Sequence, residues 1–170
     1  SGNDILLKNA SDNDLCDIWF DYFDLGTDYK EVKKELSRDK LLAKAVTYGN
    51  GIRILNQDLW ECIISFIISA NNNIPRIKNI VNNLCERFGD KITAFGNTYY
   101  SFPDVERLKK VEKDDLAFLH AGYRDAYILD AIEKVSSGEV NLAEMSGLPT
   151  EEAKTELLKI KGIGGLLLEH

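Results

Sequence analysis

Residues 58–77 read DLWECIISFIISANNNIPRI, and this stretch decides the fold. Asp58 is a residue type that caps helix N-termini, and the residues after it are apolar nearly all round. A helix of that kind is typical of the buried centre of a bundle. Three asparagines then interrupt the apolar run, and Ile74, Ile77 and Ile80 resume it at helical spacing. The stretch therefore predicts two helices of an all-α bundle, joined by an asparagine-rich loop.

Helical periodicity continues on both sides of this pair. Ser11 is a capping residue, and Leu15, Ile18, Trp19 and Tyr22 follow it at helical spacing. Further helices are predicted within residues 28–51, 74–89, 102–111, 113–122, 123–138 and 148–160. Strand signals are sparse, and one alternating stretch, residues 52–57, is predicted to be extended. The expected fold class is all-α, with consecutive helices joined by short loops.

Composition narrows the class of protein. The chain has 170 residues, of which 44% are hydrophobic, so a folded core is expected. No apolar run has membrane-spanning length and the start of the chain is polar, so we expect a cytoplasmic protein without membrane contact. The net charge of −7 argues against non-specific avidity for nucleic acid, but it does not exclude a local basic face.

The number and spacing of the cysteines and histidines do not suggest a metal centre with side-chain ligands. Cys16, Cys62 and Cys85 are far apart and odd in number, so we expect buried thiols rather than a disulfide framework. His120 and His170 are the only histidines, which makes a histidine-based zinc site improbable. No cofactor is predicted.

A glycine hairpin follows the last predicted helix. Residues 161–165 read KGIGG, in which Gly162 and Gly164 flank Ile163. Glycine permits a left-handed turn and a close backbone approach, and N–H groups at such a turn can bind a phosphate without net positive charge. A glycine turn that simply ends a helix is an equally good interpretation of this stretch alone.

Two further polar stretches each allow a purely structural interpretation and a nucleic-acid-binding one. The run Asn71–Asn73 before Pro75 and Arg76 is either a polar loop in which Asn71 caps the next helix or a set of groups that read base edges. Tyr123 and Arg124 either open an ordinary helix or form an aromatic wedge for a base step with a guanidinium beside it.

Together the three stretches resemble the 8-oxoguanine DNA glycosylase/lyase family of the helix-hairpin-helix superfamily. The resemblance rests on QDLWECIISFIISANNNIPRI, AGYRDAY and EEAKTELLKIKGIG, which are collinear between about residue 15 and Gly164. It implies a helical bundle of the helix-hairpin-helix glycosylase type, without the family's N-terminal β-sheet domain and C-terminal helices. It also implies base-excision repair of double-stranded DNA that contains oxidised guanine, by a nucleoid-associated monomer.

The resemblance assigns roles to the matching residues. Asn71 would fill the hole left by the flipped base, and Tyr123 would wedge into the stack. Arg76 and Arg124 would bind the orphan cytosine. Asn72 and Asn73 would support the loop or the backbone of the damaged strand. A phosphate would be bound by the main-chain N–H groups of Gly162, Ile163 and Gly164. A cation would be held by the carbonyls of Leu158, Ile160 and Ile163.

Departures from the family pattern limit what the chain can do. The family's nucleophilic lysine would fall on Leu166, and its catalytic aspartate beyond His170. Lys161 stands where proline is usual. We therefore interpret residues 1–170 as the central helical region of a glycosylase, trimmed at both ends and inactive by itself, with its helix-hairpin-helix at about residues 150–170. Residues 1–2 and 168–170 are interpreted as cloning or tag residues.

Three alternatives remain at this point. The chain could be a non-catalytic helical DNA-binding module, or a glycosylase of the alkylated-base branch, against which NNN and GYR speak. It could also be a protein-binding helical domain with no role on DNA.

Overall fold

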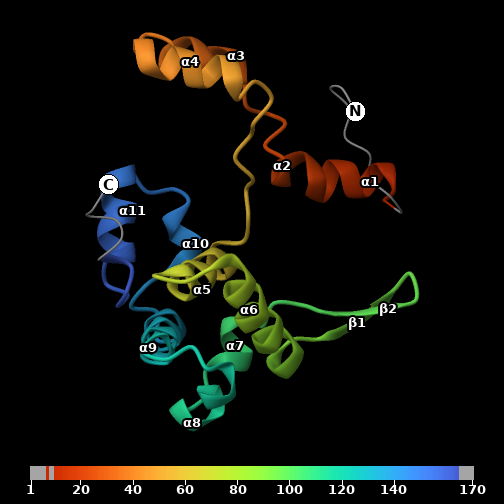
Figure 1. Cartoon of the computed structure of the whole chain (residues 1–170), viewed down its shortest axis with the longest axis vertical. Coiled ribbons are helices and arrows are strands. Elements are labelled where there is room, and N and C mark those ends of the chain that lie inside the picture. Colours follow the sequence, from red (N-terminus) through yellow and green to blue (C-terminus); the bar gives the residue numbers. More distant parts are fainter. Residues whose placement is uncertain (1–6, 8–9, 165–170) are drawn as a thin grey trace. The chain divides into compact units, whose positions relative to one another are not determined.

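The computed structural model describes residue 7 and residues 10–164. Its contacts divide the chain into two units, Ser1–Gln57 and Asp58–His170, and each is described by itself (Figure 1). The described elements of the first unit are α1 (Asp12–Asp14), the single π-turn η1 (Leu15–Trp19), α2 (Phe20–Tyr22), α3 (Tyr29–Leu36) and α4 (Lys40–Tyr48). Those of the second are α5 (Leu59–Ser69), α6 (Ile74–Phe88), β1 (Lys91–Ala94), β2 (Asn97–Tyr100), α7 (Val105–Leu108), α8 (Lys113–Leu116), the 3₁₀ turn η2 (Ala117–Leu119), α9 (Arg124–Ser136), α10 (Leu142–Met145) and α11 (Thr150–Leu157).

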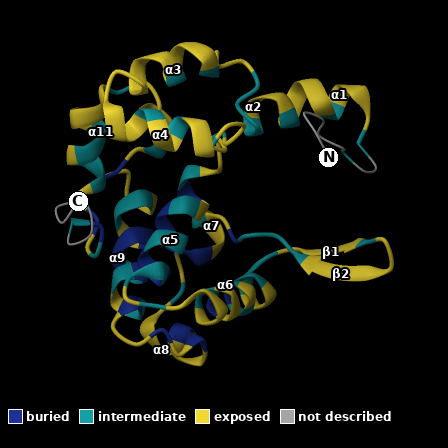
Figure 2. Cartoon of the chain, turned by 45° about the horizontal axis from the view of Figure 1, so that its top comes forward, coloured by how far each residue is buried: buried dark blue, intermediate teal, exposed yellow. Residues whose placement is uncertain are grey.

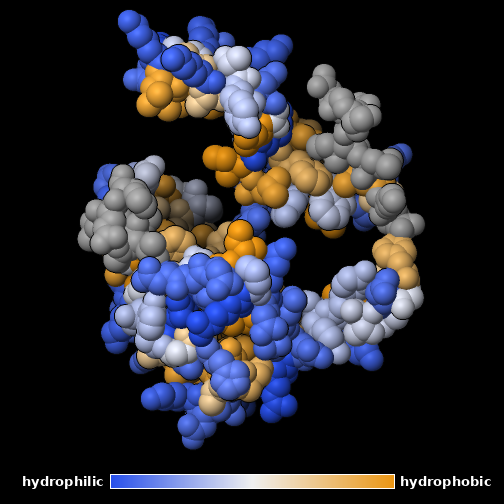
Figure 3. Space-filling view, viewed as in Figure 1, coloured by the Kyte–Doolittle hydropathy of each residue, from blue (hydrophilic) through white to orange (hydrophobic). Residues whose placement is uncertain are grey.

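Side-chain caps begin α1, α3 and α4 of the first unit. Ser11 forms the predicted cap of α1, in a reciprocal capping box with Asp14. None of the described residues of this unit is buried, and its helices expose large side chains such as Leu41 (75% exposed) and Tyr48 (96% exposed). Figure 3 shows orange, hydrophobic atoms on the surface of this unit. The described part of the unit therefore has no closed core of its own.

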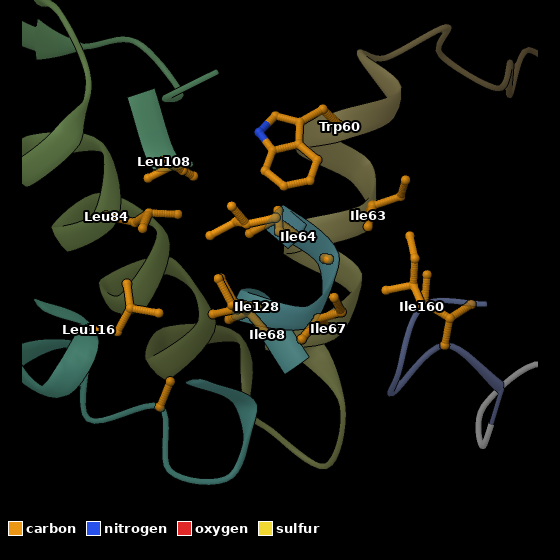
Figure 4. Packing of buried hydrophobic residues seen from close by; sticks show 14 of the residues in the cluster. Trp60, Ile63, Ile64, Ile67, Ile68, Leu84, Leu108, Leu116, Ile128 and Ile160 are labelled. Atoms are coloured by element: carbon orange, nitrogen blue, oxygen red, sulfur yellow. The ribbon is translucent and has the colours of Figure 1, made fainter. Parts of the chain in front are cut away.

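The second unit is built around α5. Ile64, Ile67 and Ile68 are fully buried, and Figure 2 shows the buried residues gathering on α5 and α9. Figure 4 shows α5 between side chains of α6 and α9, with Ile64 near Leu84 and Ile128. The helix that the sequence predicts as the centre of the bundle is thus confirmed, because an apolar surface on all sides is stable only when neighbours cover it.

The boundaries of α6 follow the local signals. The Asn73 side chain accepts the N–H of Arg76, Pro75 lies in the first turn, and Gly89 ends the helix. At Gly89 a Cβ atom would lie 1.9 Å from the carbonyl oxygen of Ser101, so this position requires glycine. The chain there passes directly into the strand pair.

The antiparallel hairpin β1–β2 was not predicted. Ile92 lies opposite Tyr99, and Phe95 and Gly96 turn the chain at positive φ. Most of its residues are exposed on both faces, so the alternation of polar and apolar residues that marks a half-buried strand is weak. Residues 52–57, which were expected to be extended by their alternation, join no strand.

The remaining expectations have mixed outcomes. The all-α class is confirmed, and helices occupy each predicted range. The prediction of three buried thiols is wrong for Cys16, which is exposed, whereas Cys62 and Cys85 are half-buried. Thr150 is a residue type that caps helix N-termini, and the sequence predicts it as the N-cap of the helix within residues 148–160. In the structure Thr150 is instead the first residue of α11, and Pro149 takes the capping position. None of the described helices is long and apolar enough to cross a bilayer.

Candidate nucleic-acid interface

The asparagine run forms a tight turn between α5 and α6. Asn71 adopts a left-handed conformation with φ of 46°, which asparagine tolerates better than most residues. Asn72 donates its amide to the carbonyl of Ile68 at 3.0 Å and accepts the N–H of Asn73, while Asn73 caps α6. The capping role falls on Asn73, so the simpler interpretation with Asn71 as the cap is wrong. Among the described residues, the exposed side chain of Asn71 has no hydrogen-bond partner.

A second turn, residues 120–123, leads into α9 and lies against this loop. His120 and Gly122 both have positive φ, of 50° and 70°. The guanidinium of Arg76 donates to the carbonyl of His120 at 2.8 Å, which bridges the start of α6 to the second turn. Arg76 remains exposed, so its side chain lies at the surface of the junction.

Arg124 joins the two turns from inside. It donates to the carbonyls of Ala70 (Nε, 3.0 Å), Asn71 (Nη2, 3.0 Å) and Ala121 (Nη1, 3.1 Å), and Nη2 also donates to Ala70. Its side chain is therefore both a positive cap on the C-terminal end of α5 and a brace for the loop. Only 4% of the residue is exposed, unlike the surface position that a direct contact with cytosine suggests. The assignment of Arg124 to cytosine stays a prediction, whereas its structural role is visible.

Tyr123 is the exposed aromatic residue of the junction. It is 52% exposed, and the guanidinium carbon of Arg124 lies 4.6 Å from its ring centroid. On its other side the ring of Tyr127 meets it edge-to-face, with centroids 5.6 Å apart. The two neighbours limit the ring's freedom while its outer half remains accessible, as a wedge requires.

Tyr127 connects the glycine hairpin to Tyr123, because its ring contacts both. Gly162 has φ of +89°, and a Cβ atom there would lie 2.5 Å from Cδ2 of Tyr127. Glycine is thus required both by the turn and by the ring against it. The asparagine loop, the Tyr123 turn and the hairpin therefore form one continuous set of contacts, as the interpretation of the three stretches as one DNA-binding face demands.

The hairpin is tied to α9 by Asp130, which is 7% exposed. Its Oδ2 atom accepts the main-chain N–H of Lys161 at 2.8 Å. Burial raises the pKa of Asp130, but hydrogen bonds from Lys161 and Lys134 outweigh it and bring the pKa below its usual value. The resulting stability is present above the ordinary aspartate pKa and is lost as the pH falls through the lowered pKa of the folded state.

Asp125, in the first turn of α9, has a pKa that is raised rather than lowered. Burial raises the pKa of Asp125, and the charges of Lys113 and His120 offset part of that rise. Its Oδ1 atom is buried and has no hydrogen-bond partner among the described residues. The carboxylate adds negative charge at the helix N-terminus, where the dipole favours it.

The predicted cation site consists of main-chain carbonyls at the end of α11. Carbonyl oxygens are donors that hard cations accept, so the set formed by Leu158, Ile160 and Ile163 fits such an ion chemically. The carbonyl of Ile160 also accepts the N–H of Ile163 at 3.4 Å, and the ammonium of Lys134 donates to the adjacent carbonyl of Lys159. The described residues contain no cluster of three acidic, cysteine or histidine side chains suited to a metal. The cation stays a prediction.

The position at which the nucleophile was expected, Leu166, lies outside the described residues. The same holds for the interpreted tag residues 1–2 and 168–170 and for the stretch predicted to form the second helix of the helix-hairpin-helix. The described junction thus offers an exposed amide, a supported aromatic ring and a backbone turn, which are groups suited to binding a ligand rather than to breaking bonds.

Comparison with known proteins agrees with this arrangement. A family model described as "8-oxoguanine DNA glycosylase, N-terminal domain" matches residues 3–63. The N-glycosylase/DNA lyase of Saccharomyces cerevisiae is 35% identical over 157 residues, which are 84% of this chain and 41% of the yeast protein. The apo structure of Clostridium acetobutylicum 8-oxoguanine glycosylase/lyase is 44% identical with a TM-score of 0.87, covering 91% of this chain and 54% of that one. The chain belongs to the 8-oxoguanine DNA glycosylase family.

Two details qualify this membership. The chain spans about half the length of the relatives that it matches. The sequence predicts a chain without the family's N-terminal β-sheet domain, yet residues 3–63 match a model of that domain, and the described part of this segment is helical.

Related structures extend the comparison to DNA and to a second branch. The Clostridium enzyme has also been solved with double-stranded DNA containing cytosine opposite 8-oxoguanine, and this chain matches it with a TM-score of 0.85 at 44% identity. A DNA-3-methyladenine glycosylase of Bacillus subtilis is 27% identical over 146 residues, or 85% of this chain and 48% of that protein.

Sequence reasoning missed two residues of this candidate site, Tyr127 and Asp130. Both lie on the face of α9 that begins at Tyr123, at the spacing i, i+4 and i+7. That spacing was a usable signal. The partner across the fold, Gly162, could not be inferred from it, because it is 35 positions away from Tyr127.

We expect Gly162→Ala to destabilise the chain more than Gly138→Ala does. Both glycines have positive φ, so both substitutions incur the cost of a left-handed alanine, about 1–2 kcal/mol. Only at Gly162 does the new Cβ meet the ring of Tyr127, whereas at Gly138 nothing lies within 4 Å. Urea unfolding followed by circular dichroism measures the difference, and equal losses for the two variants would contradict the described contact.

Proposed function

We propose that this chain forms the DNA-engaging helical part of an 8-oxoguanine DNA glycosylase/lyase acting in base-excision repair. The observation that carries the proposal is the convergence of three turns that are distant in sequence. Arg124 joins the asparagine loop to the Tyr123 turn, and Tyr127 joins that turn to Gly162. Each turn has a simpler explanation by itself, but a common explanation of all three requires a duplex lying across them.

Each group has one task in the proposed complex. Tyr123 inserts into the base stack beside the lesion, and Asn71 occupies the place of the extruded base and faces the orphan cytosine. Arg76, the exposed arginine of the junction, hydrogen-bonds that cytosine. Extrusion costs a few kcal/mol, which these contacts offset. The N–H groups of Gly162 and Gly164 bind a backbone phosphate.

The acidic character of the chain is compatible with this assignment. A net charge of −7 disfavours non-specific attraction to DNA. Binding through main-chain N–H groups, a wedge and a gap-filling amide depends on shape and local dipoles rather than on net charge. The chain thereby distinguishes lesion-containing duplex from undamaged duplex, for which its affinity is low.

We expect Arg76→Ala to relax the preference for cytosine opposite 8-oxoguanine. A good base contact contributes about 1–3 kcal/mol, so the affinity ratio between cytosine and the other opposing bases should fall about 5- to 150-fold. Fluorescence anisotropy with all four opposing bases, at two salt concentrations, measures this ratio. A phosphate-only role predicts an equal loss for all four bases and a shallower salt dependence.

Matched controls come from residues of the same type with similar exposure. Arg87 lies in the last turn of the same helix and is exposed, so Arg87→Ala removes the same charge away from the junction. Tyr99 on β2 is 50% exposed, against 52% for Tyr123. Tyr123→Ala should weaken binding to the lesion duplex strongly and Tyr99→Ala should not. Similar losses for the two tyrosines would contradict the wedge assignment.

We further propose that this chain does not form the covalent lyase intermediate. Leu166 stands where the family resemblance places the lysine nucleophile, and a leucine side chain has no amine to attack C1′ of the damaged nucleotide.

Borohydride trapping on an 8-oxoguanine·cytosine duplex should accordingly give no protein–DNA adduct. Lys161 is the amine nearest in sequence to this position, so Lys161→Ala serves as the companion variant. A lesion-dependent adduct, whether it survives in that variant or not, would contradict the proposal.

A further inference from the structure

Asp130 connects the hairpin to the helix that carries the wedge. It lies on α9, and its carboxylate accepts the main-chain N–H of Lys161, the residue immediately before Gly162. The ammonium groups of Lys161 and Lys134 each lie 3.1 Å from the same carboxylate. A buried aspartate with three donors is well satisfied, and the main-chain bond fixes the position of the turn rather than that of a flexible side chain.

The contact occurs on one face of α9. Tyr123, Tyr127 and Asp130 follow one another at helical spacing, and two of them contact the hairpin: Tyr127 through Gly162 and Asp130 through Lys161. Two adjacent contacts prevent the hairpin from rotating about either one. The distance between the wedge ring and the N–H groups of the glycines is thereby set by a single rigid helix.

We propose that Asp130 is a positioning residue that holds the glycine hairpin in register with Tyr123, so that phosphate binding and wedge insertion occur in one docked geometry. This inference rests on the proposed DNA-binding function. On this proposal, the rigid helix α9 sets the distance between the bound phosphate and the base step at the lesion. Without the carboxylate, the N–H of Lys161 loses its acceptor. Ile160 and Ile163 still anchor the hairpin in the core, but its polar main-chain tie to α9 at Lys161 is gone.

Electrostatics and positioning predict opposite effects at this residue. Removing a negative charge beside a DNA-binding surface should tighten binding if charge were the main factor. Loss of the hairpin's position should instead weaken binding, despite the gain of positive charge. The sign of the change in affinity therefore separates the two explanations.

The test is the affinity of the 170-residue chain for an 8-oxoguanine·cytosine duplex with 2-aminopurine next to the lesion. We expect Asp130→Ala to weaken binding about tenfold or more, to reduce the fluorescence rise that reports unstacking, and to make the salt dependence shallower by about one contact. Asp130→Asn keeps an acceptor oxygen for the Lys161 N–H and should fall between Asp130→Ala and wild type. It serves as the second variant if Asp130→Ala does not fold.

Two controls complete the design. Glu133→Gln removes the same charge from an exposed position of α9 and should leave affinity unchanged or slightly tighter. Lys161→Ala keeps the main-chain N–H and should retain most of the affinity. Tighter or unchanged binding by folded Asp130→Ala would overturn the positioning role alone. A wild-type chain that does not distinguish the lesion duplex from undamaged DNA would overturn the proposed function itself.

Discussion

The buried guanidinium of Arg124 is the interaction on which the described junction depends. It hydrogen-bonds the carbonyls of Ala70 and Asn71 at the end of α5 and that of Ala121 before α9. These carbonyls belong to a helix end and to turns with positive φ, where no regular partner exists for them. One planar side chain with several fixed donors satisfies them together, which lysine could not do. The turn at Asn71 and the position of Tyr123 both follow from this contact.

From that point the site extends along α9. Tyr127 supports the ring of Tyr123 and covers Gly162, and Asp130 holds the next turn of the hairpin. The apolar side of the same helix is buried against α5 through residues such as Ile128. The core thus makes α9 rigid, and its outer face holds the ring of Tyr123, the asparagine loop and the glycine turn at fixed separations. The proposed DNA binding depends on such geometry, because the long-range electrostatic interaction of a net negative chain with DNA is repulsive.

The sequence was informative where local chemistry determines structure. The apolar residues of α5, the cap of α1 and the glycines of the hairpin predicted elements that the structure confirms. It was uninformative where contacts between distant residues determine the position of a side chain. Arg124 is an example, because its carbonyl partners Ala70 and Asn71 lie more than 50 positions away. A surface role and a buried role look the same for an arginine in a sequence. The β1–β2 hairpin was missed because strands exposed on both faces carry little periodic signal.

The most direct test of this account is hydrogen exchange of the loop peptide spanning residues 70–74 in Arg124→Lys, combined with affinity for the lesion duplex. The variant keeps the charge but cannot reach all three carbonyls. The account predicts faster exchange at the Asn72 and Asn73 amides and weaker binding by a similar factor for every opposing base. Exchange at the wild-type rate, with a loss confined to cytosine, would contradict it and would show that Arg124 reads the base instead of holding the loop.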